Sequence, residues 1–411
     1  MAFRAYDRDR DREAVHRIWR EIGWIESGQE PRLDIFVDAC RSWVAEIDGE
    51  AECLVLTTPG TVRHLRDDLP MSCVAAVTTS RVARKQGFAA RLTAQAIAAD
   101  VSDGAHVSVL GMFEQGFYNR LGFGTGAYEH IVSLDPSGLR LPDGVGGRLP
   151  RRITTDDWPA VHASRLGRTR GHGACNLDVP AVTHADMLLD KNSFGLGFAD
   201  GADGELTHHL WCRIKGDVEQ GPYDVKWMAW KTPAQFVELM GVLRSLGDQI
   251  HLVKVREPAG IQLQDLVSKP FRRAAISRQS PFEATVRSIA FWQMRICDVP
   301  ACLARTRLPA AETRFNLRLT DPIERLLKDE PWRGVAGDYV VTLGSSSGAE
   351  PGHDDTLPTL TATVNAFTRL WLGVRPATGL AITDDLDAPA ELLEQLDEVL
   401  RLPSPHPDWD F

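Results

Sequence analysis

Apolar positions in the first part of the chain follow the spacing of helices in some stretches and of strands in others. Four of them recur at helical spacing and predict an amphipathic helix over residues 11–24: Val15, Ile18, Trp19 and Ile22. Apolar runs predict strands over residues 3–6, 51–57 and 106–112, and a helical segment over residues 33–47. This alternation of strands and helices predicts a mixed α/β sheet whose ligand lies at the strand ends.

Residues 71–126 organise this part of the chain, and residues 77–89 form their centre. A β-branched run predicts a strand, a basic turn with the single glycine Gly87 follows, and residues 90–99 predict a helix. The first N–H groups of a helix have no intrahelical acceptor, and a glycine lets a phosphate approach them. On this stretch alone, an anion-binding turn and an ordinary turn with solvated basic residues both remain open.

A second α/β unit is predicted after residues 136–150, which are rich in Pro and Gly and typical of a linker. Residues 151–162 repeat the order of residues 3–16: a strand, an acidic helix start and Ala-Val-His. This unit has no counterpart of Arg84-Lys85-Gln86-Gly87 before a helix. If it is a copy of the first unit, it has lost the anion-binding turn.

A third region begins near Phe291 and contains predicted strands at residues 314–319, 337–343 and 359–364, followed by closing helices. The sequence ends on Trp409-Asp410-Phe411. Chain ends are usually loose and polar, so two aromatic residues in this position indicate burial. The end is either a plug in a groove of its own domain or part of a site.

Composition and charge exclude several classes of function. The chain has 46 Lys and Arg against 56 Asp and Glu, and its net charge of −10 disfavours a nucleic-acid or anionic-membrane binder. The same charge is compatible with cationic substrates, although solubility alone also explains it. Seven cysteines without a C-x-x-C pair indicate a reduced cytoplasmic protein with no zinc site, and no metal is expected. The charged first ten residues do not suit a signal peptide, and no apolar run is long enough for a membrane span.

Several motifs in order resemble the GCN5-related N-acetyltransferases (GNAT) and, more narrowly, the enhanced intracellular survival (Eis) family. They are residues 77–89, Tyr118-Asn-Arg-Leu-Gly-Phe-Gly, Trp292-Gln-Met-Arg-Ile-Cys-Asp-Val-Pro and the Asp410-Phe411 ending. The resemblance implies a catalytic GNAT domain at 1–146, a second, degenerate GNAT domain at 147–288, and a sterol-carrier-protein-like domain at 289–411. It also implies a hexamer.

The resemblance further implies that acetyl-CoA binds beside the first strand–turn–helix. The cofactor-binding residues would be Val77, Thr78, Thr79, Arg84, Lys85, Gln86, Gly87, Phe88, Ala89, Ala90, Phe113 and Glu114. Three positions depart from the family pattern: Phe113 replaces a serine, Arg81 replaces a proline, and Tyr118-Asn-Arg-Leu-Gly-Phe-Gly replaces Tyr-Gly-Arg-Phe-Gly-Tyr-Gly. These differences concern the range of acceptors more than the donor.

The implied catalytic residues are Tyr118, as general acid, and Phe411, whose terminal carboxylate would act as general base. A phenol with a pKa near 10 is well matched to a departing thiolate near 8.5. A carboxylate near 3.5 is poorly matched to an ammonium near 10, but burial narrows that gap from both sides. Trp409 and Phe411 would provide the dry surroundings.

The acceptor would be an amine of a cationic small molecule, such as an aminoglycoside or polyamine, or a lysine side chain of a peptide. Candidate substrate-binding residues are Trp24, Glu26, Phe36 and Asp410, with Asp34 and Asp38 nearby in the sequence. The expected function is therefore acetyl-CoA-dependent N-acetylation by direct transfer in a ternary complex. The alternative is a lipid-binding or apolar-ligand-binding protein that uses the sterol-carrier-like domain, with the acetyltransferase units as an inactive scaffold.

Overall fold

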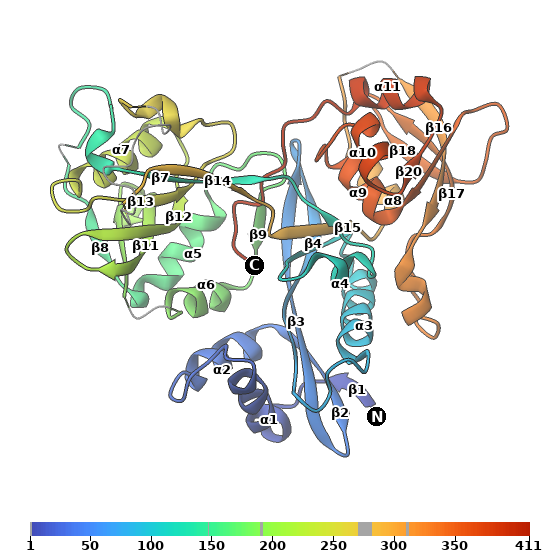
Figure 1. The fold of residues 1–411 in the computed structure, drawn as a ribbon, viewed down its shortest axis with the longest axis horizontal. Helices are drawn as coiled ribbons and strands as arrows, with labels where there is room; N and C mark the ends of the chain where they lie inside the picture. Colours follow the sequence, from blue (N-terminus) through green and yellow to red (C-terminus); the bar gives the residue numbers. More distant parts are fainter. Residues whose placement is uncertain (1, 147, 190–191, 270–281, 310–311) are drawn as a thin grey trace. The chain divides into compact units, whose positions relative to one another are not determined.

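The chain forms two compact units in the computed structural model, which describes residues 2–146, 148–189, 192–269, 282–309 and 312–411 (Figure 1). The first unit contains Met1–Ala127, His172–Val179 and Phe291–Phe411, and the second contains Tyr128–Gly171 and Pro180–Ala290. Helices and mixed sheets occur in both units. The predicted mixed α/β fold class is confirmed.

The first unit is built around a mixed sheet in the order β1-β2-β3-β4-β5-β15-β6, with β9 added to β3. Its strands are β1 (Ala2–Ala5), β2 (Arg41–Ile47), β3 (Glu50–His64), β4 (Asp67–Thr79), β5 (Val107–Gly111), β6 (Gly124–Thr125), β9 (Cys175–Leu177) and β15 (Trp292–Ile296). The associated helices are α1 (Arg8–Glu21), α2 (Glu30–Ala39), α3 (Phe88–Ser102) and α4 (Gln115–Asn119). Helix α3 buries Phe88, Leu92 and Ile97 in the core beside this sheet.

The helical segment predicted over residues 33–47 is wrong in its second half. Helix α2 ends at Ala39, and Arg41–Ile47 is strand β2, which pairs with β1 and β3. Trp43 and Val44 favour an extended backbone, and pairing on both edges stabilises it. Tertiary pairing therefore decided the structure where the local pattern was ambiguous.

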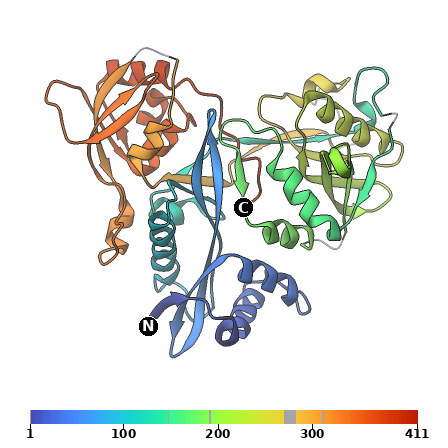
Figure 2. The same ribbon diagram turned by 180° about the vertical axis from the view of Figure 1, so that it is seen from behind.

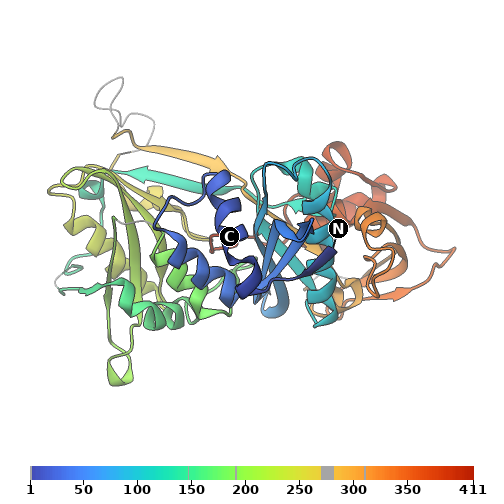
Figure 3. The ribbon, with the colours of Figure 1, turned by 90° about the horizontal axis from the view of Figure 1, so that it is seen from below.

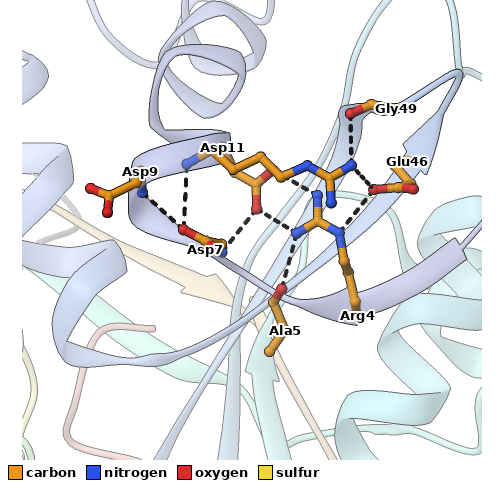
Figure 4. A network of polar contacts seen from close by, with 8 residues as sticks. Arg4, Ala5, Asp7, Asp9, Asp11, Glu46 and Gly49 are labelled. Carbon is orange, nitrogen blue, oxygen red and sulfur yellow. Dashed lines mark hydrogen bonds and ion pairs between the residues drawn. The ribbon is translucent and has the colours of Figure 1, made fainter.

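A charged network holds the start of the chain in place (Figure 4). Arg4 on β1 contacts Asp11 of α1 at 2.6 Å and Glu46 of β2 at 2.8 Å, and the Asp7 amide also donates to Asp11. Burial alone would raise the pKa of Asp11, but the hydrogen bonds from Arg4 and Asp7 hold that pKa below its usual range. Asp11 thus ties the first strand to the first helix as a carboxylate.

The second unit contains a seven-stranded sheet in the order β14-β7-β13-β12-β11-β10-β8. Its strands are β7 (Glu129–Leu134), β8 (Arg151–Ile153), β10 (Ser193–Phe198), β11 (His208–Asp217), β12 (Gly221–Ala229), β13 (Val253–Arg256) and β14 (Thr285–Ile289). The helices are α5 (Trp158–Leu166), α6 (Pro180–Met187) and α7 (Pro233–Ser245). Figure 3 shows β7 and β14 side by side, in agreement with their antiparallel pairing.

Each of the two larger sheets contains the same type of connection, a strand joined through a helix to a parallel neighbouring strand. In the first unit β4 is joined through α3 to the parallel strand β5, and in the second β12 is joined through α7 to the parallel strand β13. This shared strand–helix–strand order supports the repeat predicted from the sequence. The stretch predicted as a linker is partly packed onto the second unit, because Leu139 is buried and the Arg140 amide donates to Leu266 at 2.7 Å; residue 147 lies outside the described residues.

The last region contributes a five-stranded sheet in the order β18-β17-β16-β19-β20. Its strands are β16 (Thr313–Thr320), β17 (Gly337–Leu343), β18 (Gly348–Pro351), β19 (Thr359–Thr363) and β20 (Leu386–Asp387), and its helices are α8 (Val299–Ala304), α9 (Val364–Trp371), α10 (Ala377–Thr383) and α11 (Ala390–Val399). Strand β15, at the start of this region, instead pairs with β5 and β6 in the first sheet. Within the first unit, β15 thus links this region to the first sheet.

No helix among the described residues is both long enough and apolar enough to cross a membrane.

Candidate functional site

Strand β4 departs from regular pairing where the sequence predicts a cofactor. Between Leu56↔Ala75 and Leu54↔Thr78 the strand β4 carries one extra residue, and Ala76 has a φ of 51°. A bulge of this kind bends a strand away from its neighbour. Parallel pairing of β4 with β5 ends at Val74↔Leu110, so the following β4 residues have no strand on that side among the described pairs.

Three predicted cofactor-binding residues lie in this splayed segment: Val77, Thr78 and Thr79. The hydroxyls of Thr78 and of the neighbouring Ser80 are buried and have no hydrogen-bond partner among the described residues. A buried hydroxyl without a partner costs free energy, so such groups often mark the place of a ligand or water. The splayed strand therefore offers unpaired polar groups.

The turn that follows presents positive charge beside free helix amides. Arg84, Lys85 and Gln86 are exposed, and Gly87 is the N-cap of α3 with a φ of 81° and no side-chain cap. The Arg91 amide donates to Gly87, which leaves the amides of the first helical turn without intrahelical acceptors. These amides belong to Phe88, Ala89 and Ala90, and the Phe88 side chain is buried in the core. The geometry suits a diphosphate, which would contact Phe88 through its main chain.

The equivalent helix of the second unit has no such opening. Its N-cap, Thr232, accepts a hydrogen bond from the Gln235 amide, and the Gln235 side chain accepts from the amides of Lys231 and Thr232. These side chains occupy the positions that an anion would need. The start of α7 thus has a side-chain cap, whereas the start of α3 has none.

Tyr118 lies on the short helix α4, beyond the end of β5. The Glu114 carboxylate accepts hydrogen bonds from the Gly116 and Phe117 amides and so caps this helix. Tyr118 is 8% exposed, and burial raises its pKa to about 12. Its phenol therefore remains protonated through the physiological range, as a proton donor must. Glu114, predicted to bind the cofactor, has a clear role in positioning this helix.

Phe411 reaches the end of the same strand. A Cβ atom placed on Gly111 would lie 2.9 Å from a main-chain oxygen of Phe411. Trp409 is 2% exposed, and Asp410 and Phe411 are partly buried. Phe411 thus lies against the last residue of β5, and Tyr118 follows that residue by seven positions in the sequence.

The glycines of the motif after Tyr118 are explained by close packing against the last region. Gly122 has a φ of 85°, and a Cβ there would lie 2.8 Å from Arg295 and 3.1 Å from Asp321. Side chains at Gly124 and Gly126 would overlap Asn365 and Trp292. The two motifs recognised in the sequence, at 118–124 and 292–300, are therefore packed together, because β15 pairs with both β5 and β6.

Residues of the last region that sequence reasoning did not identify hold this turn in place. The Asn365 side chain donates to the carbonyl oxygens of Asn119 and Phe123 at 2.8 and 2.9 Å. Arg369 donates to Thr125 at 3.1 Å and pairs with Asp384 at 2.6 Å. Both lie on α9, and only their hydrophilic character on a mostly apolar helix distinguishes them in the sequence.

The region of α1 and α2 where the sequence predicts acceptor-binding residues contains aromatic side chains, and the carboxylates of Asp34 and Asp38 there are paired with basic side chains. Asp34 contacts Arg12 and His16 at 2.7 Å each, and Asp38 contacts Arg8 at 2.5 Å. Trp24 lies with its ring centroid 5.6 Å from that of Phe113, which is 85% exposed.

The other acceptor residues predicted from this part of the sequence are Phe36 and Glu26. Phe36 packs against the same core as Trp24, and Glu26 is exposed. The structure thus brings one residue of the predicted acceptor set, Trp24, beside Phe113, which was predicted to bind the cofactor.

One group of possible metal ligands occurs among the described residues: Asp200, His208 and Glu238 in the second unit. Arg148 contacts Asp200 at 2.5 Å and Glu238 at 3.5 Å. Its guanidinium provides the positive charge that these two carboxylates would otherwise share with a metal. The cluster is an ion-pair network.

Comparison with known proteins assigns the first part of the chain. Residues 8–126 match the family model described as Acetyltransferase (GNAT) domain. No curated protein sequence matches the chain.

Solved structures similar over the whole length include a probable N-acyltransferase from Enterococcus faecalis V583, with a TM-score of 0.78 and 17% identity over 100% of this chain and 99% of that one. A GCN5-related N-acetyltransferase from Anabaena variabilis and Eis1 from Mycobacterium abscessus each show a TM-score of 0.76 and 15% identity over 100% of both chains. Residues 8–126 are therefore a GNAT acetyltransferase domain, and the fold of the whole chain is shared with these three solved structures.

Proposed function

We propose that the protein transfers an acetyl group from acetyl-CoA to an amine of a cationic small molecule or of a lysine-bearing peptide. One observation carries the proposal: the uncapped start of α3 follows the splayed end of β4, while Phe411 lies against the last residue of β5 and Tyr118 lies on the helix that follows it. Acetyl-CoA would supply the acetyl group as a thioester. Arg84, Lys85 and the amides of the first α3 turn would hold its diphosphate.

The proposed catalytic roles follow from the surroundings of each group. Tyr118 would donate its phenolic proton as general acid, since burial keeps that proton in place. The carboxylate of Phe411 would take a proton from the acceptor amine. The two groups would act within one ternary complex without a covalent enzyme intermediate.

Recognition of the acceptor would depend mainly on aromatic faces. Asp34 and Asp38 are already paired with arginines, so their charges are partly neutralised. The faces of Trp24 and Phe113 attract a cation, an interaction worth about 0.5–2 kcal/mol, and the exposed Glu26 adds negative charge. Aminoglycosides, polyamines and lysine side chains all offer the required ammonium group. Phe36 and Asp410 would complete this surface.

Finer parts of the proposal concern organisation and location. We propose a catalytic GNAT domain at 1–146, a degenerate GNAT domain at 147–288 and a sterol-carrier-protein-like domain at 289–411. We also propose that the protein is a hexamer and lies in the cytoplasm. Native mass spectrometry of the purified protein tests the assembly, and also tests whether a lipid is retained by residues 289–411. Retained lipid together with no acetyl-CoA binding would favour the alternative of a lipid-binding protein.

The central test combines binding and turnover. Calorimetry should show acetyl-CoA binding, and an acetyl-CoA consumption assay across aminoglycosides, polyamines and lysine peptides should identify an acceptor. Tyr118→Phe and deletion of Phe411 should each lower kcat by about 100-fold or more and leave acetyl-CoA affinity near wild type.

Two conservative variants serve as controls for these substitutions. Tyr339→Phe removes a different partly buried phenol, and Phe411→Leu keeps the carboxylate. Both should retain most of the activity. Absence of acetyl-CoA binding would refute the proposal.

A further inference from the structure

The last residues of the sequence form an ordered, buried tail. Residues 401–411 have no helix or strand, yet Pro405, His406, Pro407 and Trp409 are buried. An irregular terminal segment is normally mobile unless main-chain bonds or packing fix it. The partners that fix this tail are therefore informative.

One such partner comes from an unexpected part of the sequence. His172–Val179 lies between two stretches of the second unit in the sequence, but it belongs to the first unit in the structure. Within it, β9 pairs with the far end of β3 in the register Gly60↔Leu177 to Val62↔Cys175. The Arg63 amide also donates to Ala174 at 2.9 Å, and the Gly173 amide donates to Arg63 at 2.7 Å. Figures 1 and 2 show β9 beside β3.

The same segment binds the tail. The His406 amide donates to the His172 carbonyl at 3.0 Å, and the Cys175 amide donates to the Pro407 carbonyl at 2.8 Å. Residues 172–175 thus lie between β3 and the tail and bond to both. Only three residues lie between Pro407 and Phe411, so this attachment limits how far Phe411 can move.

Gly173 is required for this contact on two independent grounds. Its φ is 83°, a conformation that residues with a side chain rarely adopt. A Cβ there would lie 2.6 Å from the His406 nitrogen and 2.7 Å from a Pro405 carbon. Any side chain at this position would push the tail away.

The His172 ring fixes the corner of the segment. Its Nδ1 accepts a hydrogen bond from the Leu65 amide at 3.0 Å, so its Nε2 carries the proton and donates to the Leu372 carbonyl at 3.0 Å. The ring also lies edge-on to His64 at 5.0 Å. The segment is therefore bonded to β3, to the end of α9 and to the tail.

We propose that residues 172–177 are a positioning segment that holds residues 405–411 in register and thereby places Phe411 beside Gly111. Its effect on catalysis rests on the proposed function, in which the Phe411 carboxylate is the base. His172 and Gly173 are positioning residues, because they act through the tail. A displacement of about 1 Å at a reacting group can cost about 100-fold in rate.

The first test compares two glycine substitutions. Gly173→Ala introduces both backbone strain and the clash with the tail, whereas Gly49→Ala introduces strain alone, since Gly49 has a φ of 91° and no atom within 4 Å of a Cβ. Hydrogen exchange of residues 405–411 should become faster in Gly173→Ala and stay unchanged in Gly49→Ala. The kcat of Gly173→Ala should fall at least tenfold, with acetyl-CoA affinity unchanged.

A double-mutant comparison separates positioning from general damage. In a chain that lacks Phe411, Gly173→Ala should lower the residual kcat by less than twofold, because the group that it misplaces is already absent. An undiminished effect in that background, or unchanged exchange of the tail, would overturn the proposal.

An insertion pair tests the register without altering Gly173. A glycine inserted between Pro403 and Ser404, in the exposed part of the tail, should be tolerated because the bonds to residues 172 and 175 lie beyond it. A glycine added after Phe411 moves the carboxylate by about 3.5 Å and should lower kcat about as much as deletion of Phe411 does. Equal losses from the two insertions would contradict the positioning role.

The outcomes also distinguish this proposal from the proposed function. If Gly173→Ala frees the tail while deletion of Phe411 leaves turnover unchanged, the segment holds the tail but the carboxylate is not the base. If deletion of Phe411 abolishes turnover while Gly173→Ala changes neither exchange nor kcat, the base stands and the positioning segment is wrong.

Discussion

The ion pair between Arg295 and Asp321 joins β15 to the last region and is fully shielded from solvent. Its atoms Nη2 and Oδ2 lie 2.6 Å apart, and both side chains are 0% exposed. Arg295 also donates to the Leu121 carbonyl, three residues beyond Tyr118. Asp321 accepts two further hydrogen bonds, from the Ile323 and Val335 amides at 3.1 and 3.0 Å. Burial alone would lower the pKa of Arg295, but the charge of Asp321 raises it above its ordinary value.

Asp321→Ala should severely lower the free energy of unfolding of the first unit, which contains both partners of the pair. The substitution leaves the Arg295 guanidinium buried without a counter-charge, which typically costs 3–5 kcal/mol. It also leaves two buried amides without acceptors. Since whole domains are stable by about 5–15 kcal/mol, this loss would be a large fraction of the total.

Hydrogen exchange of peptides that cover β15 and residues 321–335 measures the free energy of opening for this part of the chain alone. The matched control is Asp338→Ala, which breaks an exposed pair with Arg318 at 3.2 Å and should cost about 1 kcal/mol or less. Adding Arg295→Met to Asp321→Ala should recover part of the loss, because the uncompensated charge disappears. A cost for Asp321→Ala as small as that of the control would refute the reasoning.

Three further predictions concern pH and the acceptor. Burial raises the pKa of Tyr118 to about 12, so its phenol should stay protonated up to at least pH 10. The kcat should therefore rise with pH as the acceptor amine loses its proton, and it should not decline below about pH 10. A decline of kcat near pH 8–9 would exclude Tyr118 as the general acid. Burial lowers the pKa of His64 to about 3, with the charge of His172 adding to the effect, and it also lowers the pKa of His172. Below about pH 6.5 the unfolded chain binds a proton at His64, whereas the folded chain leaves His64 neutral down to about pH 3. Stability should therefore fall from pH 6.5 downward by up to about 1.4 kcal/mol per pH unit for His64, and His172 contributes in the same direction. Unfolding measured from pH 7 to pH 4 checks this, and His64→Phe should flatten the slope. Trp24→Ala should raise the KM for the acceptor about 2- to 30-fold and leave acetyl-CoA affinity unchanged, as steady-state kinetics and calorimetry will show.

The site could be predicted from the sequence wherever the chemistry is local. The strand, the basic turn and the helix start around Gly87 are neighbours in the sequence, and their pattern alone predicts both the elements and the free amides. The sequence shows the glycines after Tyr118 as a motif but does not show why glycine is required at these positions. The reason lies in the close approach of Arg295, Asn365 and Trp292 from the other end of the chain.

Strand exchange between sheets could not be predicted in this way. Residues 129–134 follow the first sheet directly but form β7 in the second, while β15 returns from residues 292–296 to pair with β5. Apolar, β-branched strands fit either sheet equally well, so the local sequence pattern does not determine with which neighbouring strand a segment pairs. The same holds for residues 41–47, where pairing on both edges made a strand of an ambiguous segment.

The proposed role of Phe411 would require residues from distant parts of the first unit. A main-chain carboxyl has no side-chain identity, so its chemistry depends only on where the chain puts it. Here its location depends on Gly111 in β5, on a buried tail, and on a segment near residue 173 that the sequence places among elements of another unit. None of these three features is distinctive within its own stretch of the sequence. Only their meeting gives the last residue a place beside the strand that leads to Tyr118.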